Sequence, residues 1–409
     1  MLKKISSQHL RPGMYLQELC GSWMEHPFWR TSFLLEDAKD VRRVIESGIT
    51  EVWIDVSKGL DAPEHGQAPE DAREEVEQEL IAAVSEAPKP VERVSMAHEV
   101  ARAAKICAKA KEAVTTMFQE ARMGKAISAN DAAPLVEEIS ASVMRNPGAV
   151  ISLARLKTKD DYTYMHSVAV CALMVALAKQ LGLDAEQTRK AGMAGLLHDV
   201  GKMMIPLEVL NKPGKLTDEE FATVKAHPAE GHKMLLSGEG VDDIALDVCL
   251  HHHEKIDGSG YPERLAGEQI SLFARMGAVC DVYDAITSNR PYKAGWSPAE
   301  SLRKMAEWCK GHFDETIFKA FVKSVGIYPI GTLVRLESGR LAVVMDQSEK
   351  SLLTPKIKVF YSTKSKARIP PEIVDLSRPG VKEKIAAYED PSQWGIPDLD
   401  ALWQQAAAD

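Results

Sequence analysis

Histidines and acidic residues that could bind metal ions cluster in the middle of this chain. Seven of the twelve histidines lie between positions 166 and 253, and local sequence places them near helix ends. Neutral imidazoles and carboxylates suit divalent Fe, Mn, Zn or Ni, and one Asp can bridge two ions through its two oxygens. A bridged pair of ions activates a shared water and neutralises phosphate charge, which indicates metal-assisted hydrolysis of a phosphoester. The candidate residues are His166, His198, Asp199, His227, His251, His252, His253 and Asp281.

Basic and glycine-containing segments beside these residues could bind the phosphates of a substrate. Lys202 can aim an ammonium at a phosphate oxygen or protonate a leaving alkoxide. Arg290 and Lys293 could grip a second phosphate, with a solvated helix end as the alternative. In the segment 257–262, two glycines permit unusual backbone angles beside Tyr261, which could contact the ligand or only pin the loop.

Together, these motifs resemble the signature of the HD-GYP domains, bacterial cyclic di-GMP phosphodiesterases in the HD superfamily of metal-dependent phosphohydrolases. Five separated motifs occur in the family's order, and the resemblance covers residues 128–325, nearly half of the chain. Residues 1–60 also resemble the small domain of unknown function often found before HD-GYP domains. The motifs are His198-Asp199-Val-Gly-Lys202, His252-His253-Glu254, Asp257-Gly-Ser-Gly-Tyr261-Pro262, Asp281, and Arg290-Pro-Tyr-Lys293.

The resemblance implies a dinuclear metal site in which Asp199 bridges the two ions. One ion would be surrounded by His166, His198, Asp199 and Asp281, and the other by Asp199, His227, His252 and His253. Fe or Mn are the first candidates for these two divalent transition-metal ions, with Zn or Ni as the others. The motif register leaves His251 as an outer residue, and His232 has no matching position in the family.

One position departs from the family pattern. Some members hold a third metal with a Glu one helical turn before the first ligand histidine, and here Tyr162 stands at that position. A phenol is a poor substitute because its ordinary pKa is about 10, and Asp161 lies on a different angular face of the helix. We therefore expect two metal ions.

The implied activity is hydrolysis of cyclic di-GMP to pGpG and GMP by a metal-bridging hydroxide. Asp199 and Lys202 would be the catalytic residues, and Lys202, Arg290, Lys293 and Tyr261 would bind the substrate. One alternative is a phosphodiesterase for another cyclic dinucleotide, such as cyclic GMP-AMP, since no motif defines base selection. Another is a low-turnover module that senses cyclic di-GMP or serves as a scaffold. The resemblance also suggests diguanylate cyclase domains as partners through the 257–262 loop, and a homodimer remains open.

Composition limits the classes of protein that this chain can be. A net charge of −9 over 409 residues argues against a nucleic-acid polymer as partner. The longest uncharged apolar run, 168–178, has eleven residues, short of the roughly 20 that span a bilayer, so no membrane span is expected. The start lacks the apolar segment of a secretory signal, and six scattered cysteines without a CxxC pair fit the cytoplasm.

Periodicity and composition predict a mainly α protein in which a large helical domain has a small N-terminal α/β domain before it and a C-terminal β appendage after it. The resemblance implies that the helical domain is an HD-type phosphohydrolase domain. In residues 1–60 we expect a helix at 37–47, ended by Gly48, and a strand at 52–56 with one buried face. After this domain we expect an acidic, proline-containing linker with one short helix at 61–90, a connecting helix that could be a stalk at 91–127, and the catalytic domain at 128–325. Residues 326–409 are expected to form a β-hairpin appendage around 338–339 and a tail that is a peripheral helix from Asp390.

Overall fold

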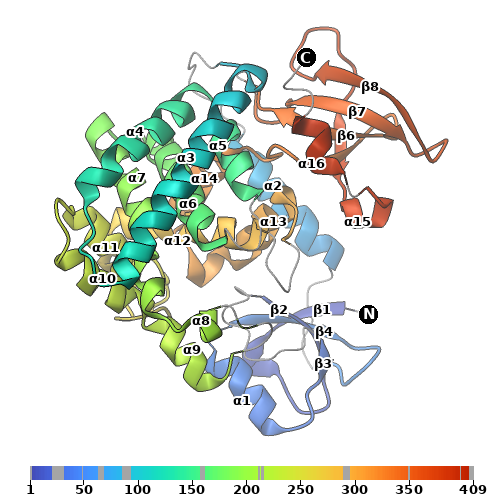
Figure 1. Cartoon of the computed structure of the whole chain (residues 1–409). Coiled ribbons are helices and arrows are strands. Elements are labelled where there is room, and N and C mark those ends of the chain that lie inside the picture. The colour runs from blue at the N-terminus through green and yellow to red at the C-terminus, as the bar shows by residue number, and fades with distance from the viewer. Residues whose placement is uncertain are drawn as a thin grey trace.

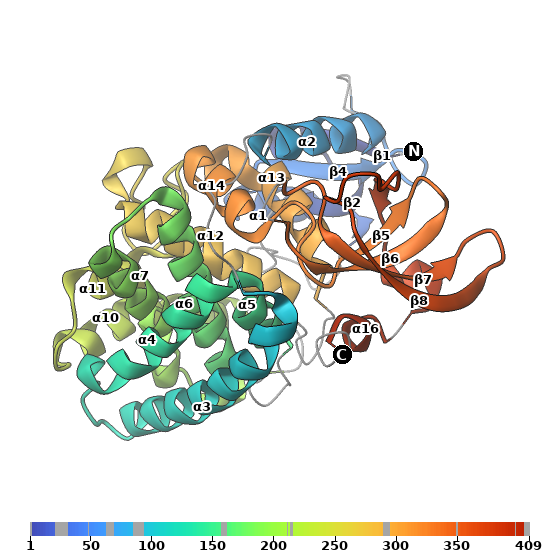
Figure 2. The ribbon, with the colours of Figure 1, turned by 90° about the horizontal axis from the view of Figure 1, so that it is seen from above.

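The computed structural model describes residues 2–20, 32–47, 49–62, 69–84, 94–156, 162–210, 212, 216–288, 295–348, 351–396 and 398–404. Three parts are visible: a small N-terminal sheet, a large group of helices and a C-terminal sheet (Figures 1 and 2). The predicted fold class is confirmed.

The N-terminal part is an antiparallel sheet of strand order β1-β4-β2-β3, with one helix, α1, between β3 and β4. Its elements are β1 (Leu2–Ser6), η1 (Ser7–His9), β2 (Tyr15–Cys20), β3 (Phe33–Leu34), α1 (Ala38–Glu46) and β4 (Glu51–Asp55). Asp37 begins α1 because its carboxylate accepts the backbone N–H of Lys39 and Asp40. The predicted helix and strand are present, and the predicted Gly48 cap lies outside the described residues.

The prediction that β4 has only one buried face is wrong. Trp53 is 6% exposed and Asp55 is 7% exposed, although both alternate with the aliphatic residues of the strand. The sheet has neighbours that the strand's own sequence does not reveal: α2 (Pro69–Val84) contacts β1, and α13 (Pro298–His312) contacts β2. Burial on both faces therefore comes from tertiary packing.

The described parts of the predicted linker at 61–90 and of the predicted connecting helix at 91–127 both pack against the rest of the protein. The acidic segment contains a 16-residue helix, α2, where a short one was expected, and Val76, Leu80 and Val84 are buried on its apolar face. The expected stalk is α3 (Met96–Arg122), which packs along α4, α5 and α6. Its buried face, which includes Val114 and Phe118, makes α3 part of the helical core.

In the helical domain, α6 is the central element, with every side chain from 165 to 178 buried. It is the one helix within the described ranges that is long and apolar enough to cross a membrane, but 78% of its apolar window is buried inside the protein, as in the core helix of a soluble protein. The domain consists of α4 (Ala129–Arg145), α5 (Pro147–Arg155), α6 (Tyr162–Leu181), α7 (Ala185–Leu197), η3 (Val200–Met204), α8 (Leu207–Leu210), α9 (Asp218–Lys225), α10 (His227–Leu236), α11 (Asp243–His251), η4 (Gly267–Gln269), α12 (Leu272–Thr287), α13 and α14 (Glu315–Val325).

The C-terminal part is an antiparallel sheet of order β8-β7-β6-β5-β9. Its strands are β5 (Leu333–Leu336), β6 (Arg340–Asp346), β7 (Lys356–Ser362), β8 (Ala367–Asp375) and β9 (Ile385–Tyr388). The predicted hairpin turn lies between β5 and β6, where Gly339 has φ +78°. The tail is not peripheral: α15 (Pro391–Trp394) is followed by α16 (Leu399–Gln404), whose Trp403 is fully buried against the sheet.

Candidate metal centre

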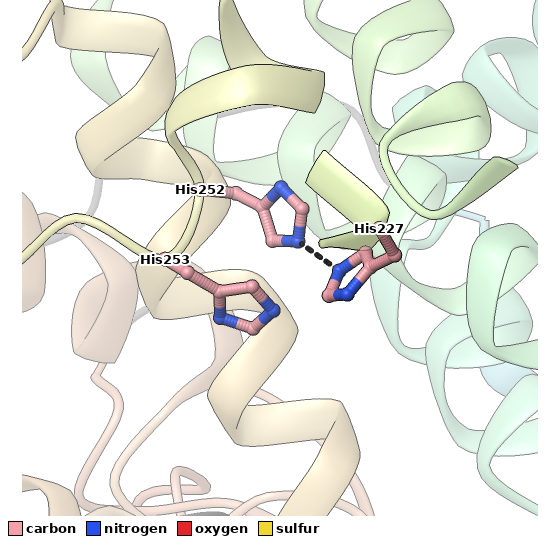
Figure 3. A group of neighbouring side chains, drawn as sticks. All are labelled: His227, His252 and His253. Atoms are coloured by element: carbon pink, nitrogen blue, oxygen red, sulfur yellow. Dashed lines mark hydrogen bonds between the residues drawn. The ribbon is translucent and has the colours of Figure 1, made fainter. Parts of the chain in front are cut away.

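All seven predicted metal-binding residues converge at one place in the helical domain. They come from five segments far apart in the chain: α6, the end of α7, the start of α10, the end of α11 and the middle of α12. Two groups form, and in each group one potential ligand atom per residue lies within 4.8 Å of the others. The first group is His166, His198, Asp199 and Asp281, and the second, drawn in Figure 3, is His227, His252 and His253.

Helix ends orient three of the imidazoles. Their Nδ1 atoms lie at hydrogen-bond distance from backbone carbonyls, which only accept, so Nδ1–H must be the donor. Each neutral ring then carries its lone pair on Nε2, the atom that faces the centre. The pairs are His198 with Gly195 O at 2.8 Å, His227 with Val224 O at 2.6 Å, and His252 with Val248 O at 3.0 Å.

A side chain orients the fourth imidazole. Asp284, on α12, accepts the Nδ1–H of His166 at 2.6 Å, and both residues are buried. This leaves Nε2 of His166 facing Asp281 Oδ1 at 2.9 Å and Asp199 Oδ2 at 3.3 Å. Carboxylate–histidine pairs of this kind fix the ring and increase its basicity as a metal ligand.

Asp199 lies between the two groups and turns one oxygen toward each. Its Oδ2 is 3.3 Å from His166 Nε2 and 3.4 Å from His198 Nε2. Its Oδ1 is 3.2 Å from His227 Nε2 and 3.8 Å from His252 Nε2. A carboxylate oxygen opposite an imidazole lone pair is an acceptor opposite an acceptor, which is favourable only with a cation between them.

Unpaired buried atoms support the same conclusion. Asp199 Oδ1, Asp281 Oδ2 and His253 Nε2 are buried and have no hydrogen-bond partner among the described residues. Leaving such atoms unpaired costs about 1–3 kcal/mol each, so native proteins usually satisfy them. All three are good ligand atoms for divalent transition metals, and the residues present therefore fit metal ions.

Electrostatics keeps Asp199 and His252 in the protonation states that metal binding needs, whereas His166 must release a proton when a metal ion binds. Burial raises the pKa of Asp199, but nearby Lys202 and His198 outweigh it and hold that pKa well below the usual range. Burial lowers the pKa of His252 to about 3, which keeps its imidazole neutral. His166 differs: burial lowers its pKa, but Asp199, Asp281 and Asp284 together raise it to about 10.

Comparisons with known proteins agree with this geometry. The family described as "HD domain" matches residues 144–317, and the family described as "Domain of unknown function (DUF3391)" matches residues 2–132. A cyclic di-GMP phosphodiesterase of Pseudomonas aeruginosa is 57% identical over 404 residues, 98% of this chain and 96% of that protein. The chain belongs to the HD-GYP phosphodiesterase family. Members of the wider HD superfamily use divalent metals, in accord with the cluster here.

More distant relatives match less than half of this HD-GYP protein. A cyclic di-GMP phosphodiesterase of Vibrio cholerae is 39% identical over 189 residues, 42% of this chain and 38% of that protein. A 3'3'-cGAMP-specific phosphodiesterase of the same organism is 35% identical over 190 residues, 46% of this chain and 42% of that protein. The N-terminal family match reaches residue 132, beyond the predicted domain at 1–60, and takes in α2 and α3.

The predicted phosphate-binding residues are only partly described. Lys202 Nζ pairs with Asp199 Oδ2, which places its ammonium at the centre. Tyr261 stacks on the imidazole of His253 with ring centroids 4.8 Å apart, and the ammonium of Lys225 lies 5.0 Å from the centre of the Tyr261 ring. Arg290 and Lys293 lie outside the described residues.

The remaining predictions concern residues around the centre. His251 turns away from it and pairs with Asp247 at 2.7 Å, as expected for an outer residue, and His232 belongs to neither group. Tyr162 stacks on His166 with centroids 6.0 Å apart and ring planes 6° apart, while Asp161 lies outside the described residues.

Sequence reasoning missed Asp284, although a signal was available. Asp284 follows Asp281 by three residues on α12, and this spacing places both carboxylates on the same face of the helix. Once Asp281 is assigned to the centre, a second acid one turn later is a candidate to orient a ligand histidine.

Proposed function

We propose that this protein hydrolyses cyclic di-GMP to pGpG and GMP at a site that holds two divalent ions, Fe or Mn. The observation that carries the proposal is the position of Asp199, which offers one carboxylate oxygen to each of two convergent histidine groups. The choice of substrate is supported by the relative that matches almost the entire chain, a cyclic di-GMP phosphodiesterase.

Within this mechanism, the side chains bind and orient. When bound, two bridged ions would lower the pKa of a shared water and neutralise phosphate charge. Asp199 would be the ligand that both ions share, and Lys202, which pairs with it, contributes positive charge for a phosphate oxygen or a proton for the leaving group. Arg290 and Lys293 bind the second phosphate of the dinucleotide, and Tyr261 contacts the ligand beside His253.

The proposed number of ions rests on Tyr162. Its ring lies against His166, at the position where a third ion would need a carboxylate. A neutral phenol binds a divalent ion poorly near pH 7, so the proposal assigns two ions to each chain.

We also propose a cytoplasmic location and a contact surface for diguanylate cyclase domains. The 257–262 loop projects Asp257 and Ser259 to solvent, where another protein can reach them. A homodimer is a further proposal, which sedimentation of the purified protein would test.

Metal analysis of freshly purified protein, combined with chromatography of reaction products, tests the activity. Cyclic di-GMP, cyclic GMP-AMP and pGpG should each be supplied to the same preparation. We expect two ions per chain, pGpG and GMP from cyclic di-GMP, and loss of activity on chelation. Faster turnover of cyclic GMP-AMP, or binding of cyclic di-GMP without turnover, would contradict the proposal.

A further inference from the structure

His253 differs from the other four histidines of the centre in how its ring is held. His166, His198, His227 and His252 each donate Nδ1–H to an acceptor. Within the described residues, the ring of His253 makes no hydrogen bond: its Nε2 has no partner, and Nδ1 is 3.9 Å from Asp281 Oδ2. The dashed line in Figure 3 joins His227 and His252 and does not reach His253. Something else must fix the direction of this ring.

The loop that follows His253 folds back onto it. Tyr261 donates its backbone N–H to the carbonyl of His253 at 3.2 Å, and its phenol ring stacks on the imidazole with ring planes 25° apart. Gly260 permits this close return, because a Cβ there would lie 2.6 Å from His253 O and 2.4 Å from Lys255 N. Tyr261 therefore packs against the face of the one ring that lacks a hydrogen bond.

Glu254 anchors the far end of the same loop. The residue is 2% exposed, and its carboxylate accepts three successive backbone N–H groups: those of Glu263 at 2.6 Å, Arg264 at 3.0 Å and Leu265 at 3.1 Å. Arg264 has φ +58°, and a left-handed residue helps consecutive N–H groups turn toward one anion. The loop is thus closed on Glu254, the neighbour of His253.

We propose that Glu254 is a positioning residue: it closes the loop that presses Tyr261 onto His253, and so directs His253 Nε2 toward the second metal ion. The inference rests on the two-ion centre of the proposed function. The stacked ring takes the place of the hydrogen bond that orients each of the other histidines. Partners of this kind around metal ligands typically contribute 10- to 100-fold to metal affinity.

Calorimetric titration of the metal-depleted full-length protein with Mn²⁺ tests the proposal. Glu254→Gln leaves one oxygen acceptor and turns an NH₂ group toward backbone donors, so we expect the second Mn²⁺ to bind at least tenfold more weakly and the first to bind as in wild type. The titration should match that of His253→Ala. Glu268→Gln, an exposed charge change on η4, is the matched control and should titrate like wild type.

Tyr261 variants test the same link with the Glu254 anchor left intact. Tyr261→Ala should weaken the second Mn²⁺ to a similar extent, and Tyr261→Phe, which keeps the ring, should not. Because both residues act through one loop, the double variant Glu254→Gln with Tyr261→Ala should bind the second Mn²⁺ with no lower affinity than the single variant that binds it less tightly.

Hydrogen exchange separates this proposal from a purely structural role for Glu254. We expect the amides of 263–265 to exchange faster in Glu254→Gln, together with the loss of second-site affinity. Faster exchange with both Mn²⁺ ions bound as in wild type would overturn the inference. If wild type fails to cleave cyclic di-GMP but the selective metal loss occurs, the proposed substrate is wrong and the role of Glu254 stands.

Discussion

Asp284 offers a sharp test of how the centre is organised, because it touches a ligand histidine and is assigned no direct role in metal binding. Its Oδ2 accepts Nδ1–H of His166 at 2.6 Å in a fully buried environment. Asp284→Ala would leave that N–H without an acceptor and free the ring to rotate or to move its proton to Nε2. Either change removes the lone pair that faces Asp199 and Asp281.

The expected magnitude follows from the bond that is lost. A hydrogen bond to a charged group contributes about 1.5–3 kcal/mol. At about 1.4 kcal/mol for each tenfold change, this corresponds to roughly 10- to 150-fold weaker binding of the ion held by His166. Asp284→Asn should have a smaller effect, because the amide oxygen can still accept the N–H and only the charge is lost.

The assay is titration of metal-depleted protein with Mn²⁺, followed by measurement of kcat at saturating metal. Asp247→Ala is a matched control, because Asp247 pairs with His251 at a similar distance of 2.7 Å but outside both ligand groups. The reasoning is refuted if Asp284→Ala binds Mn²⁺ as tightly as wild type, or if Asp247→Ala weakens binding equally.

Three further predictions concern catalysis, substrate binding and acid stability. Asp199→Ala should reduce kcat to far below a tenth of wild type, a barrier change above roughly 1.4 kcal/mol, while circular dichroism shows the helices retained. Arg290→Ala or Lys293→Ala should raise KM about 10- to 100-fold and leave the metal content unchanged. A variant that loses metal would show that the replaced residue does not act in substrate binding alone. Burial and the positive charge of Lys255 lower the pKa of His312 to about 3 in the folded protein. Below about pH 6.5 the unfolded chain therefore binds a proton at His312 that the folded protein does not, and the free energy of unfolding falls as pH decreases toward 3. Denaturant unfolding at pH 7 and pH 5 should show that His312→Gln loses up to about 2 kcal/mol less unfolding free energy than wild type between the two pH values. An equal loss in wild type and variant would contradict this prediction.

The sequence predicted which histidines and aspartates come together better than it predicted the packing around them. Motif spacing selected His252 and His253 over His251, and the structure directs the first two toward the centre and the third toward Asp247. Candidate ligands can be recognised in the sequence because few residue types bind divalent transition metals and because the order of these motifs along the chain is distinctive.

The predictions of exposed segments were wrong mainly because segments far apart in the chain pack against one another. The composition of α2 is that of a solvated linker, yet Val76, Leu80 and Val84 are buried with residues of α13 and α14. The strand predicted at 52–56 was expected to bury one face, yet Trp53 on its other face is also buried, because the elements that cover it lie elsewhere in the chain. Local periodicity identifies an apolar stripe but does not say which segment will cover it.

The residues that orient the ligands were harder to predict than the ligands, and helix geometry explains why. The last carbonyls of a helix lack an intrahelical partner. His198, His227 and His252 each follow the end of a helix and donate Nδ1–H to a carbonyl of its last turn. One contact therefore gives a carbonyl at the helix end a further donor and aims Nε2 at the candidate metal centre. Any residue supplies such a carbonyl, so no side-chain type marks it in the sequence. For His166 the orienting partner is a side chain, Asp284, and for His253 we propose the Tyr261 ring, which the Glu254 loop holds in place.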